Sequence, residues 1–304
     1  MHVTFIGAVP KAQQSQGRLL CEPVCQTAAN EGCRYVTVNK SLKSSFGKGQ
    51  VNPYLRRSSA PHVSRETTQS VISRVKKLSD SQIVDEEFLA KRFIPELGLN
   101  DEILSEQPPE FSAHFGTGIY LWQYPNQLAA RLVDLARSQP ASTHYMEIGS
   151  RWSGTFLLMS LWLSRVSSRR FEQATALDVI EAPPLIRSLT DLETELGFKV
   201  VDLQMDSHDE RVEGYVANSR PDTVLIDSEH SVQAALHDHM LFEAVSDRII
   251  HHDIASDALP HLAFFYESIA TLGADRWSSK VFDHQYESVA GSFLGIGLLE
   301  RKLA

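Results

Sequence analysis

The sequence predicts an α/β protein: a doubly wound, Rossmann-like, mostly parallel seven-stranded sheet with a C-terminal antiparallel hairpin, plus an N-terminal α+β extension. Three observations favour this fold class. Short apolar runs alternate with runs of helical periodicity between residues 144 and 272, as they do where helices connect parallel strands. A turn rich in small residues follows the first apolar run, and acidic or histidine residues follow each of five such runs. Ligands of doubly wound sheets bind beyond the carboxyl ends of the strands, so the pattern also predicts where a site lies.

Buried parallel strands read as short apolar runs, and we expect strands at 144–148, 175–179, 199–205, 223–226 and 248–252. Helical periodicity predicts intervening helices at 155–164, 185–196, 208–217 and 232–244, and a further one at 259–272. The last two apolar runs, 279–282 and 292–299, are close enough along the chain to form a hairpin at the edge of the sheet.

The first third of the chain lacks this alternation. Runs at 3–9 and 35–38 predict short strands with a helix at 19–29 between them, and residues 40–64 have the composition of a loop or linker. Helices are expected at 67–78 and 81–93, with Asp80 as the N-cap of the second. An amphipathic helix follows Pro125. We therefore expect an accessory region, residues 1–110, before a ligand-binding domain of residues 111–304.

Composition narrows the function classes. Of the 304 residues, 42% are hydrophobic and 22% are charged, which is ordinary for a globular protein. No apolar run approaches the ~20 residues that span a bilayer, and we find no signal-peptide pattern, so we expect a cytoplasmic protein with no membrane partner. The spacing of Cys21, Cys25 and Cys33 is not usual for zinc, and reduced thiols fit better.

The charge is unevenly distributed. Residues 1–80 contain 12 Lys or Arg and 4 Asp or Glu, whereas the remainder contains 17 basic and 34 acidic residues. An acidic body argues against a broad nucleic-acid surface. The basic arm could bind an acidic partner or pack on its own body.

The segment YMEIGSRWSGT at 145–155 reads as a strand, a tight turn and the start of a helix. Gly149 and Gly154 allow the backbone to pass close to a ligand, and the helix N-terminus offers N–H donors to a carboxylate or phosphate. The spacing of the glycines differs from that of dinucleotide sites, and no P-loop lysine follows. A tight turn without a ligand is the alternative.

Polar residues end all five predicted parallel strands. A single acid in such a place is usually a helix cap, but five ends in succession predict a binding site. Strand alternation directs the side chain of His251 away from the site that His252 shares, so we expect His251 to be structural. In chain order, the strand ends are Glu147, Asp178, Asp206-Ser207, Asp227-Ser-Glu-His230 and His251-His252-Asp253.

This order of residues resembles class I S-adenosylmethionine-dependent methyltransferases. The closer similarity is to the sugar and small-molecule O-methyltransferases, a group that includes macrolide-sugar methyltransferases and cephalosporin-hydroxylase-like proteins. It is carried by YLWQYPNQ at 120–127, LIDSEHS at 225–231, IIHHDI at 249–254 and GSFLGIGLL at 291–299.

The resemblance implies that S-adenosylmethionine is the cofactor. It assigns Glu147 and the loop that follows to the methionine part, Asp178 to the ribose hydroxyls, and Asp206 with Ser207 to the adenine. The cofactor residues it implies are Gln123, Glu147, Gly149, Ser150, Gly154, Asp178, Asp206 and Ser207.

The resemblance also implies a metal and a base. In metal-dependent members, an Asp after the fourth strand and an acidic pair after the fifth bind magnesium, and a His three residues beyond the first Asp is the base. Here Asp227 and His230 match, and the pair is His252-Asp253. We therefore expect Asp227, His252 and Asp253 to bind a divalent cation, Mg or Mn, although an imidazole suits transition metals better than magnesium. Alternatively, the two aspartates cap helices and His230 caps a turn.

The expected function is O-methyl transfer to a hydroxyl of a sugar or another small-molecule natural product, with His230 and Asp227 as catalytic residues. Residues 1–110 would cover the acceptor pocket or mediate self-association into a homo-oligomer. Two alternatives remain: a non-catalytic cofactor-fold protein with residues 1–80 as an interaction arm, and a metal-dependent hydroxylase-like enzyme.

Overall fold

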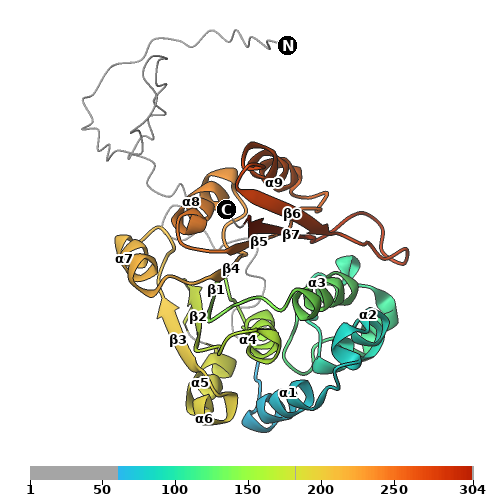
Figure 1. Ribbon diagram of the computed structural model, residues 1–304. Helices are drawn as coiled ribbons and strands as arrows, with labels where there is room; N and C mark the ends of the chain where they lie inside the picture. Colours follow the sequence, from blue (N-terminus) through green and yellow to red (C-terminus); the bar gives the residue numbers. More distant parts are fainter. Residues whose placement is uncertain (1–60, 182, 303–304) are drawn as a thin grey trace, which may run out of the picture. The chain divides into compact units, whose positions relative to one another are not determined.

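The computed structural model describes residues 61–181 and 183–302 (Figure 1). They contain a seven-stranded sheet of order β3-β2-β1-β4-β5-β7-β6. Neighbouring strands from β3 to β5 are parallel, and β7 is antiparallel to both β5 and β6. The predicted doubly wound sheet with a C-terminal antiparallel pair is confirmed. The strands are β1 (His144–Ile148), β2 (Gln173–Asp178), β3 (Lys199–Gln204), β4 (Thr223–Ile226), β5 (Arg248–His252), β6 (Trp277–Phe282) and β7 (Ile296–Arg301).

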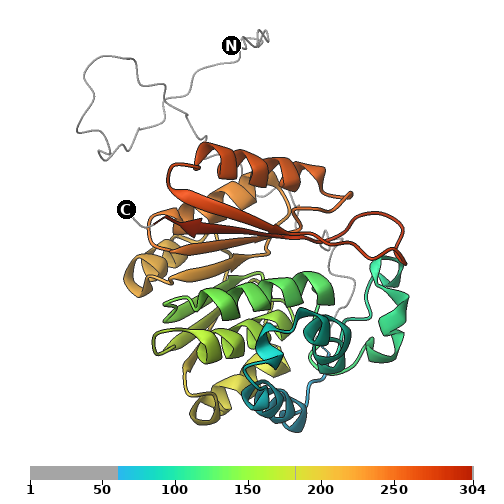
Figure 2. The same cartoon turned by 45° about the vertical axis from the view of Figure 1, so that its right-hand side comes forward.

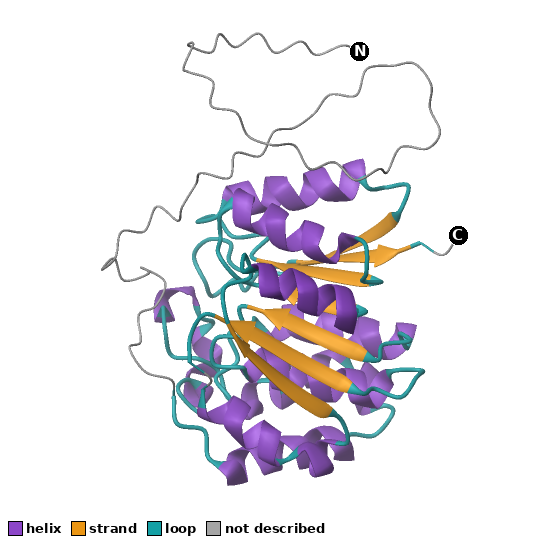
Figure 3. Cartoon of the chain, turned by 90° about the vertical axis from the view of Figure 1, so that its left-hand side faces the viewer, coloured by secondary structure: helices purple, strands orange, loops and turns teal. Residues whose placement is uncertain are grey.

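Helices cover both faces of the sheet (Figures 2 and 3). On one face α4 contacts β1, α5 contacts β3, and α3 contacts β6 and β7, whereas on the other α8 contacts β4 and β5, and α9 contacts β6. The helices of the first face are α3 (Pro125–Ser138), α4 (Gly154–Val166), α5 (Pro184–Asp191) and α6 (Glu193–Leu196). Those of the second are α7 (Glu210–Ser219), α8 (Val232–Glu243) and α9 (Pro260–Leu272).

Strand alternation divides the core into two layers. In β1, Tyr145 is buried in the cluster that contains α3, α4 and α5, and Met146 is buried in the cluster that contains α7, α8 and α9. Ile250 and Ile249 of β5 divide in the same way. Because both faces of these strands are buried, they read as continuous apolar runs, and this is why their ends could be predicted closely.

The segment before the sheet packs on the first face. Ser64 caps α1 (Arg65–Lys77) by accepting a hydrogen bond of 3.1 Å from the Thr67 amide. Val71 and Val75 of α1 are buried in the same cluster as α4 and α5. Residues well before position 110 therefore contribute to the main hydrophobic core.

Some sequence predictions lie outside the described residues: the strands at 3–9 and 35–38, the helix at 19–29, the three cysteines and most of the loop at 40–64. Among the residues that are described, none of the helices combines the length and the apolar character needed to cross a membrane.

The predicted helix at 81–93 is wrong as a single helix. A 3-10 turn, Gln82–Val84, precedes α2 (Glu86–Phe88), and a π-helical turn follows it. The Asp85 side chain accepts a hydrogen bond of 3.0 Å from the Phe88 amide and so starts a new helix. Asp80 is not a cap: its side chain is fully exposed and faces Arg165.

Other helices and strands begin or end at residues that differ from the predicted ones, for local reasons. The helix predicted at 185–196 is divided at Leu192 into α5 and α6. Asp209 caps α7, so this helix begins two residues after its predicted start. The last strand begins at Ile296, not at residue 292, because Leu294 and Gly295 have φ angles of 61° and 96°, which no strand residue adopts.

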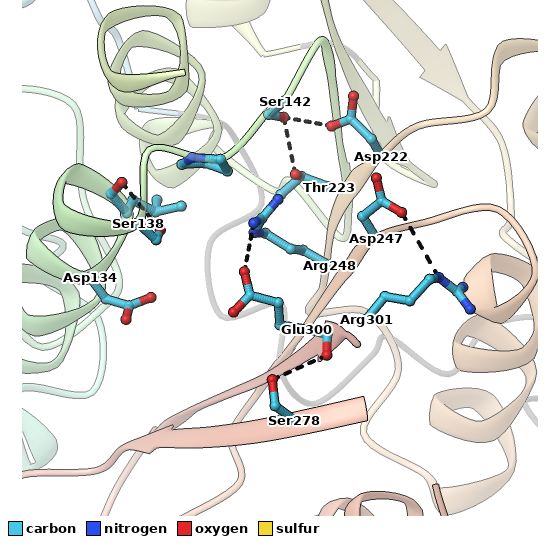
Figure 4. A network of polar contacts seen from close by, with 12 residues as sticks. Asp134, Ser138, Ser142, Asp222, Thr223, Asp247, Arg248, Ser278, Glu300 and Arg301 are labelled. Carbon is cyan, nitrogen blue, oxygen red and sulfur yellow. Dashed lines mark hydrogen bonds and ion pairs between the residues drawn. The ribbon is translucent and has the colours of Figure 1, made fainter. Parts of the chain in front are cut away.

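A polar network ties β1 to β4 at the amino ends of these strands (Figure 4). The carboxylate of Asp222 accepts hydrogen bonds of 2.6 Å from the Ser142 hydroxyl, 2.6 Å from the Thr143 amide and 3.1 Å from the His144 amide. The network lies at the opposite end of the sheet from the predicted site, so it bears on stability and not on ligand binding.

We expect Asp222→Ala to lower the free energy of unfolding by about 2–4 kcal/mol, because it leaves several donors without an acceptor and removes a charged acceptor. Urea unfolding followed by circular dichroism measures this change. Asp247→Ala is the matched control: its side chain is 63% exposed and lies 3.9 Å from Arg301, so its removal should change stability by at most about 1 kcal/mol. Equal effects of the two substitutions would contradict the prediction.

Candidate functional site

The site is organised by the close approach of the turn after β1 to the end of β4. Gly149 has a φ angle of 82°, and a Cβ there would lie only 1.9 Å from the carbonyl oxygen of Asp227. Only glycine fits this position. The Asp227 amide in turn donates a hydrogen bond of 2.9 Å to the Ile148 carbonyl, so the two strand ends are held together.

Two carboxylates and two imidazoles meet beyond β4 and β5. His252 Nδ1 lies 3.1 Å from Asp227 Oδ1 and 3.3 Å from Asp253 Oδ1. His230 Nε2 lies 3.2 Å from Asp253 Oδ2 and 3.5 Å from Asp227 Oδ1. The structure therefore brings together all four residues for which the sequence predicted base or metal roles.

Burial and charge oppose each other in this cluster. Burial alone would raise the pKa of Asp227, but the neighbouring imidazoles of His252 and His230 outweigh it and hold the pKa well below its usual value. Burial alone would lower the pKa of His252, but Asp227 and Asp253 raise it well above its usual value. Without a cation, the imidazolium of His252 therefore offsets part of the negative charge of the two carboxylates.

The donor set of this cluster fits a divalent ion. One ligand atom from each of Asp227, His252 and Asp253 lies within 4.8 Å of the others. The second ring nitrogen of His252, Nε2, is buried without a hydrogen-bond partner among the described residues. Two carboxylates and one imidazole suit manganese, iron, cobalt or zinc better than magnesium, which prefers oxygen ligands only.

Asp178 ends β2 beside the turn after β1. Its Oδ2 accepts a hydrogen bond of 2.6 Å from the Arg151 amide, and its Oδ1 accepts one of 3.0 Å from the Ile180 amide. Burial raises the pKa of Asp178, although these amides stabilise its charged form. Each carboxylate oxygen has a second lone pair, so the group can still accept hydrogen bonds from a diol.

Glu147 lies inside β1 and is only 2% exposed. Burial raises its pKa to about 8, although the Tyr145 hydroxyl donates a hydrogen bond of 2.5 Å to it. Near neutral pH this carboxyl is mostly protonated, and it can then donate a hydrogen bond as well as accept one.

Gln123, Ser150 and Gly154, which the sequence also predicted at the cofactor, differ in their surroundings. Gln123 is 2% exposed, and its Oε1 has no hydrogen-bond partner among the described residues. Ser150 is buried, and its carbonyl accepts a hydrogen bond of 2.6 Å from the Ser153 amide. A Cβ at Gly154 would lie 2.2 Å from the Ile119 carbonyl oxygen, so this glycine is needed for packing.

Asp206 and Ser207 follow β3, two strands away from β1. Asp206 is exposed and accepts a hydrogen bond of 2.9 Å from the His208 amide, whereas Ser207 is 7% exposed. No contact between described residues joins either of them to Glu147 or Asp227.

Sequence reasoning missed Glu102. This carboxylate is 8% exposed and accepts hydrogen bonds of 2.7 Å from Arg151 Nη2 and 3.1 Å from Trp152 Nε1. The Arg151 guanidinium also lies 4.5 Å from the ring centre of Trp122. Only one feature of the sequence hinted at this contact: the cationic Arg151 lies inside the turn between Gly149 and Gly154. Residues before position 110 resemble no known family, so no resemblance pointed to Glu102.

A small pocket with about 20 Å³ of free volume opens beside the cluster, and Asp227, His230 and His252 line it together with His251 and Phe265. His251 contacts His239, with 3.1 Å between Nε2 and Nδ1. The structural role that strand alternation predicts for His251 stays a prediction.

No family model and no curated protein matches the chain. Three solved structures with a similar fold have low identity and low TM-scores. Precorrin-6y C5,15-methyltransferase from Geobacter metallireducens is 13% identical over 60% of this chain and 90% of its own, with a TM-score of 0.38. The MycE methyltransferase of the mycinamycin biosynthetic pathway, in complex with Mg and SAH, is 14% identical over 60% of this chain and 50% of its own, with a TM-score of 0.39. An rRNA methylase from Streptococcus thermophilus is 11% identical over 56% of this chain and 93% of its own, with a TM-score of 0.40.

This chain thus spans half of the length of the MycE chain. At such values the matches carry no information about function. Information about the function therefore comes from the residues of the site.

The buried imidazole pair predicts acid sensitivity. Burial lowers the pKa of His239 to about 4 and that of His251 well below its usual value, whereas both have a pKa of about 6.5 in an unfolded chain. As the pH falls from about 6.5 to about 4, the unfolded chain binds protons that the folded chain does not, so stability present above this window is lost within it. We expect each group to cost about 1.4 kcal/mol per pH unit, measured by urea unfolding near pH 7 and near pH 5.

His239→Gln should make this loss of stability with falling pH shallower. The raised pKa of Glu147 acts in the opposite direction between about pH 8 and 4.5, and those of His230 and His252 do so above about pH 6.5. The contribution of the buried pair is therefore the difference in pH dependence between the wild type and His239→Gln. His284→Gln, at an exposed position, should leave the pH dependence unchanged. A pH dependence that is identical in all three proteins would disprove the role of the buried pair.

Proposed function

We propose that the protein is an S-adenosylmethionine-dependent O-methyltransferase that acts on a hydroxyl of a sugar or another small-molecule natural product. The observation that carries this proposal is the position of His230 beside two carboxylates at adjacent strand ends, next to the glycine turn. Its Nε2 lies 3.2 Å from Asp253 and 3.5 Å from Asp227. An imidazole in such a position is the usual general base for a hydroxyl.

The residues around the turn after β1 support cofactor binding. Asp178 can accept hydrogen bonds from a ribose diol, and buried Glu147 can hold a polar group at the end of β1. The Oε1 atom of Gln123, which has no hydrogen-bond partner within residues 61–181 and 183–302, is a further acceptor. When bound, S-adenosylmethionine supplies a methyl group from a sulfonium, which leaves as a neutral thioether.

In this proposal His230 removes the proton from the acceptor hydroxyl as the oxygen takes up the methyl group. Asp253 and Asp227 orient the ring and stabilise the imidazolium that forms. The same two carboxylates and His252 would hold a divalent cation, which as a Lewis acid lowers the pKa of a bound hydroxyl. His252 is buried and therefore has a fixed position relative to both aspartates.

Calorimetry tests the cofactor site. Asp178→Ala should weaken S-adenosylmethionine binding by about 1–3 kcal/mol, as expected for the loss of hydrogen bonds to a charged group. Asp275→Ala, at a side chain that is 78% exposed, is the matched control and should bind normally. Unchanged affinity in the Asp178 variant would remove this residue from the site.

Chelation and rescue test the metal. Activity should fall in EDTA and return with Mn²⁺ or Mg²⁺, and Asp253→Ala should abolish the rescue, because it removes one of the two carboxylates. His230→Ala should lower turnover by roughly 10²–10⁴-fold without weakening metal binding, as expected when a positioned base is lost.

The control for this experiment is His284→Ala, at an exposed position, which should keep full activity. Full activity in EDTA, with no metal in the purified protein, would disprove the cation and leave the base. Bound iron together with oxygen-dependent turnover would favour the hydroxylase-like alternative.

A further inference from the structure

A second group of metal-ligating side chains lies between the β3–α7 loop and α8, away from the cluster at Asp227. Atoms of His208, His237 and Asp238 that can act as ligands all lie within 4.8 Å of one another. The helices α7 and α8 are in contact and lie side by side in Figure 1. We propose that these three residues form a second site for a divalent transition metal, with the chemistry of Zn²⁺, which joins this loop to α8.

The geometry of the two imidazoles supports this proposal. Their rings are stacked, with 4.1 Å between centroids and an angle of 20° between planes. Side-chain exposure is 41% for both. A metal binds an imidazole nitrogen in the plane of the ring, and this exposure allows both rings to turn until a nitrogen of each lies about 2.0–2.1 Å from a shared ion.

Carboxylates already orient both rings. His208 Nδ1 lies 3.1 Å from Asp206 Oδ1, and His237 Nδ1 lies 3.2 Å from Asp238 Oδ1. The carboxylate of Asp206 fixes the tautomer of His208 and leaves its Nε2 for a metal, whereas His237 would share the ion with Asp238 through Nδ1. None of the hydrogen bonds between described residues involves the Nε2 atom of either ring.

Asp238 is a built element of this group and not a surface acid. It is fully buried, and its Oδ2 accepts a hydrogen bond of 2.5 Å from the Ser228 hydroxyl, so its orientation is fixed. Asp206 and Glu213 also lie close enough to His237 to add negative charge around it. The surroundings thus favour a cation, and two imidazoles select zinc, cobalt or nickel over magnesium.

The positions of the three ligands along the chain indicate the effect that a bound ion would have. Ser228 follows Asp227 directly, and His208 follows Asp206 and Ser207, the pair expected at the adenine. An ion at this site would join the loop after β3 to α8 and restrict its movement. None of the three ligands belongs to the base or to the first metal cluster, but Asp206, which orients His208, is one of the residues expected at the cofactor.

Zinc titration of the metal-free full-length chain tests the proposal, with a chromophoric chelator as competitor. The His208→Ala and His237→Ala variants should each bind one zinc ion fewer than the wild type. Loss of a residue that only supports a ligand lowers metal affinity by about 10–100-fold, so loss of a ligand should lower the zinc affinity of this site by at least as much. His284→Ala should bind as the wild type does. Zinc should also raise the Tm of the wild type and of His284→Ala. The rise in Tm on adding zinc should be smaller in His208→Ala and in His237→Ala.

Stoichiometry separates this site from the cluster at Asp227. If the wild type binds one ion that His237→Ala loses and Asp253→Ala keeps, this site exists and the metal of the proposed function does not. If Asp253→Ala loses the single ion and His237→Ala keeps it, the second site is disproved. Unchanged zinc affinity in both His208→Ala and His237→Ala would also overturn it, and because His208 lies in an exposed loop, its variant tests the site even if His237→Ala does not fold.

Discussion

The backbone contact between Gly149 and Asp227 is the constraint on which the site depends. The turn after β1 can pass the end of β4 only because a hydrogen atom occupies the place of a Cβ, which would lie 1.9 Å from the Asp227 carbonyl oxygen. This contact fixes the distance between the glycine turn and the carboxylate that organises His230 and His252. A side chain at position 149 would therefore separate the expected cofactor residues from the expected catalytic ones.

Charge balance is the second constraint. Two carboxylates at neighbouring strand ends, of which Asp227 is half-buried and Asp253 is buried, would repel each other and carry a desolvation cost. His252 lies within 3.3 Å of both and compensates them when protonated. A divalent cation can take over this role, because it neutralises the same carboxylates and needs an unprotonated imidazole. An imidazole between the two carboxylates can thus compensate their charge by binding a proton or by binding a metal ion.

The sequence predicted the sheet well because its parallel strands are buried on both faces. The bounds of β1, β4 and β5 agree with the apolar runs at 144–148, 223–226 and 248–252. Prediction failed where a single side chain or glycine changed the local backbone. Asp85 starts a new helix inside 81–93, and the positive φ of Gly295 delays the last strand.

The site was predictable in part for the same reason. Strand alternation separated His252, which faces Asp227, from His251, which faces His239. It could not identify Glu102, which lies 49 residues before Arg151 in a region of short turns without periodicity. A contact of this kind depends on tertiary packing, which no local pattern records.

Glu102 shows that the region before the sheet helps to hold the turn after β1. The turn after β1 is held from three directions: Gly149 packs on the end of β4, Gly154 packs on the Ile119 carbonyl, and Arg151 and Trp152 both bind Glu102. Two of these three supports come from residues before α3. Arg151 and Ser153 have left-handed φ angles of 43° and 68°, a conformation that costs energy unless neighbouring contacts hold it. The conformation of the expected cofactor turn is therefore set jointly by the sheet and by the segment between residues 99 and 121.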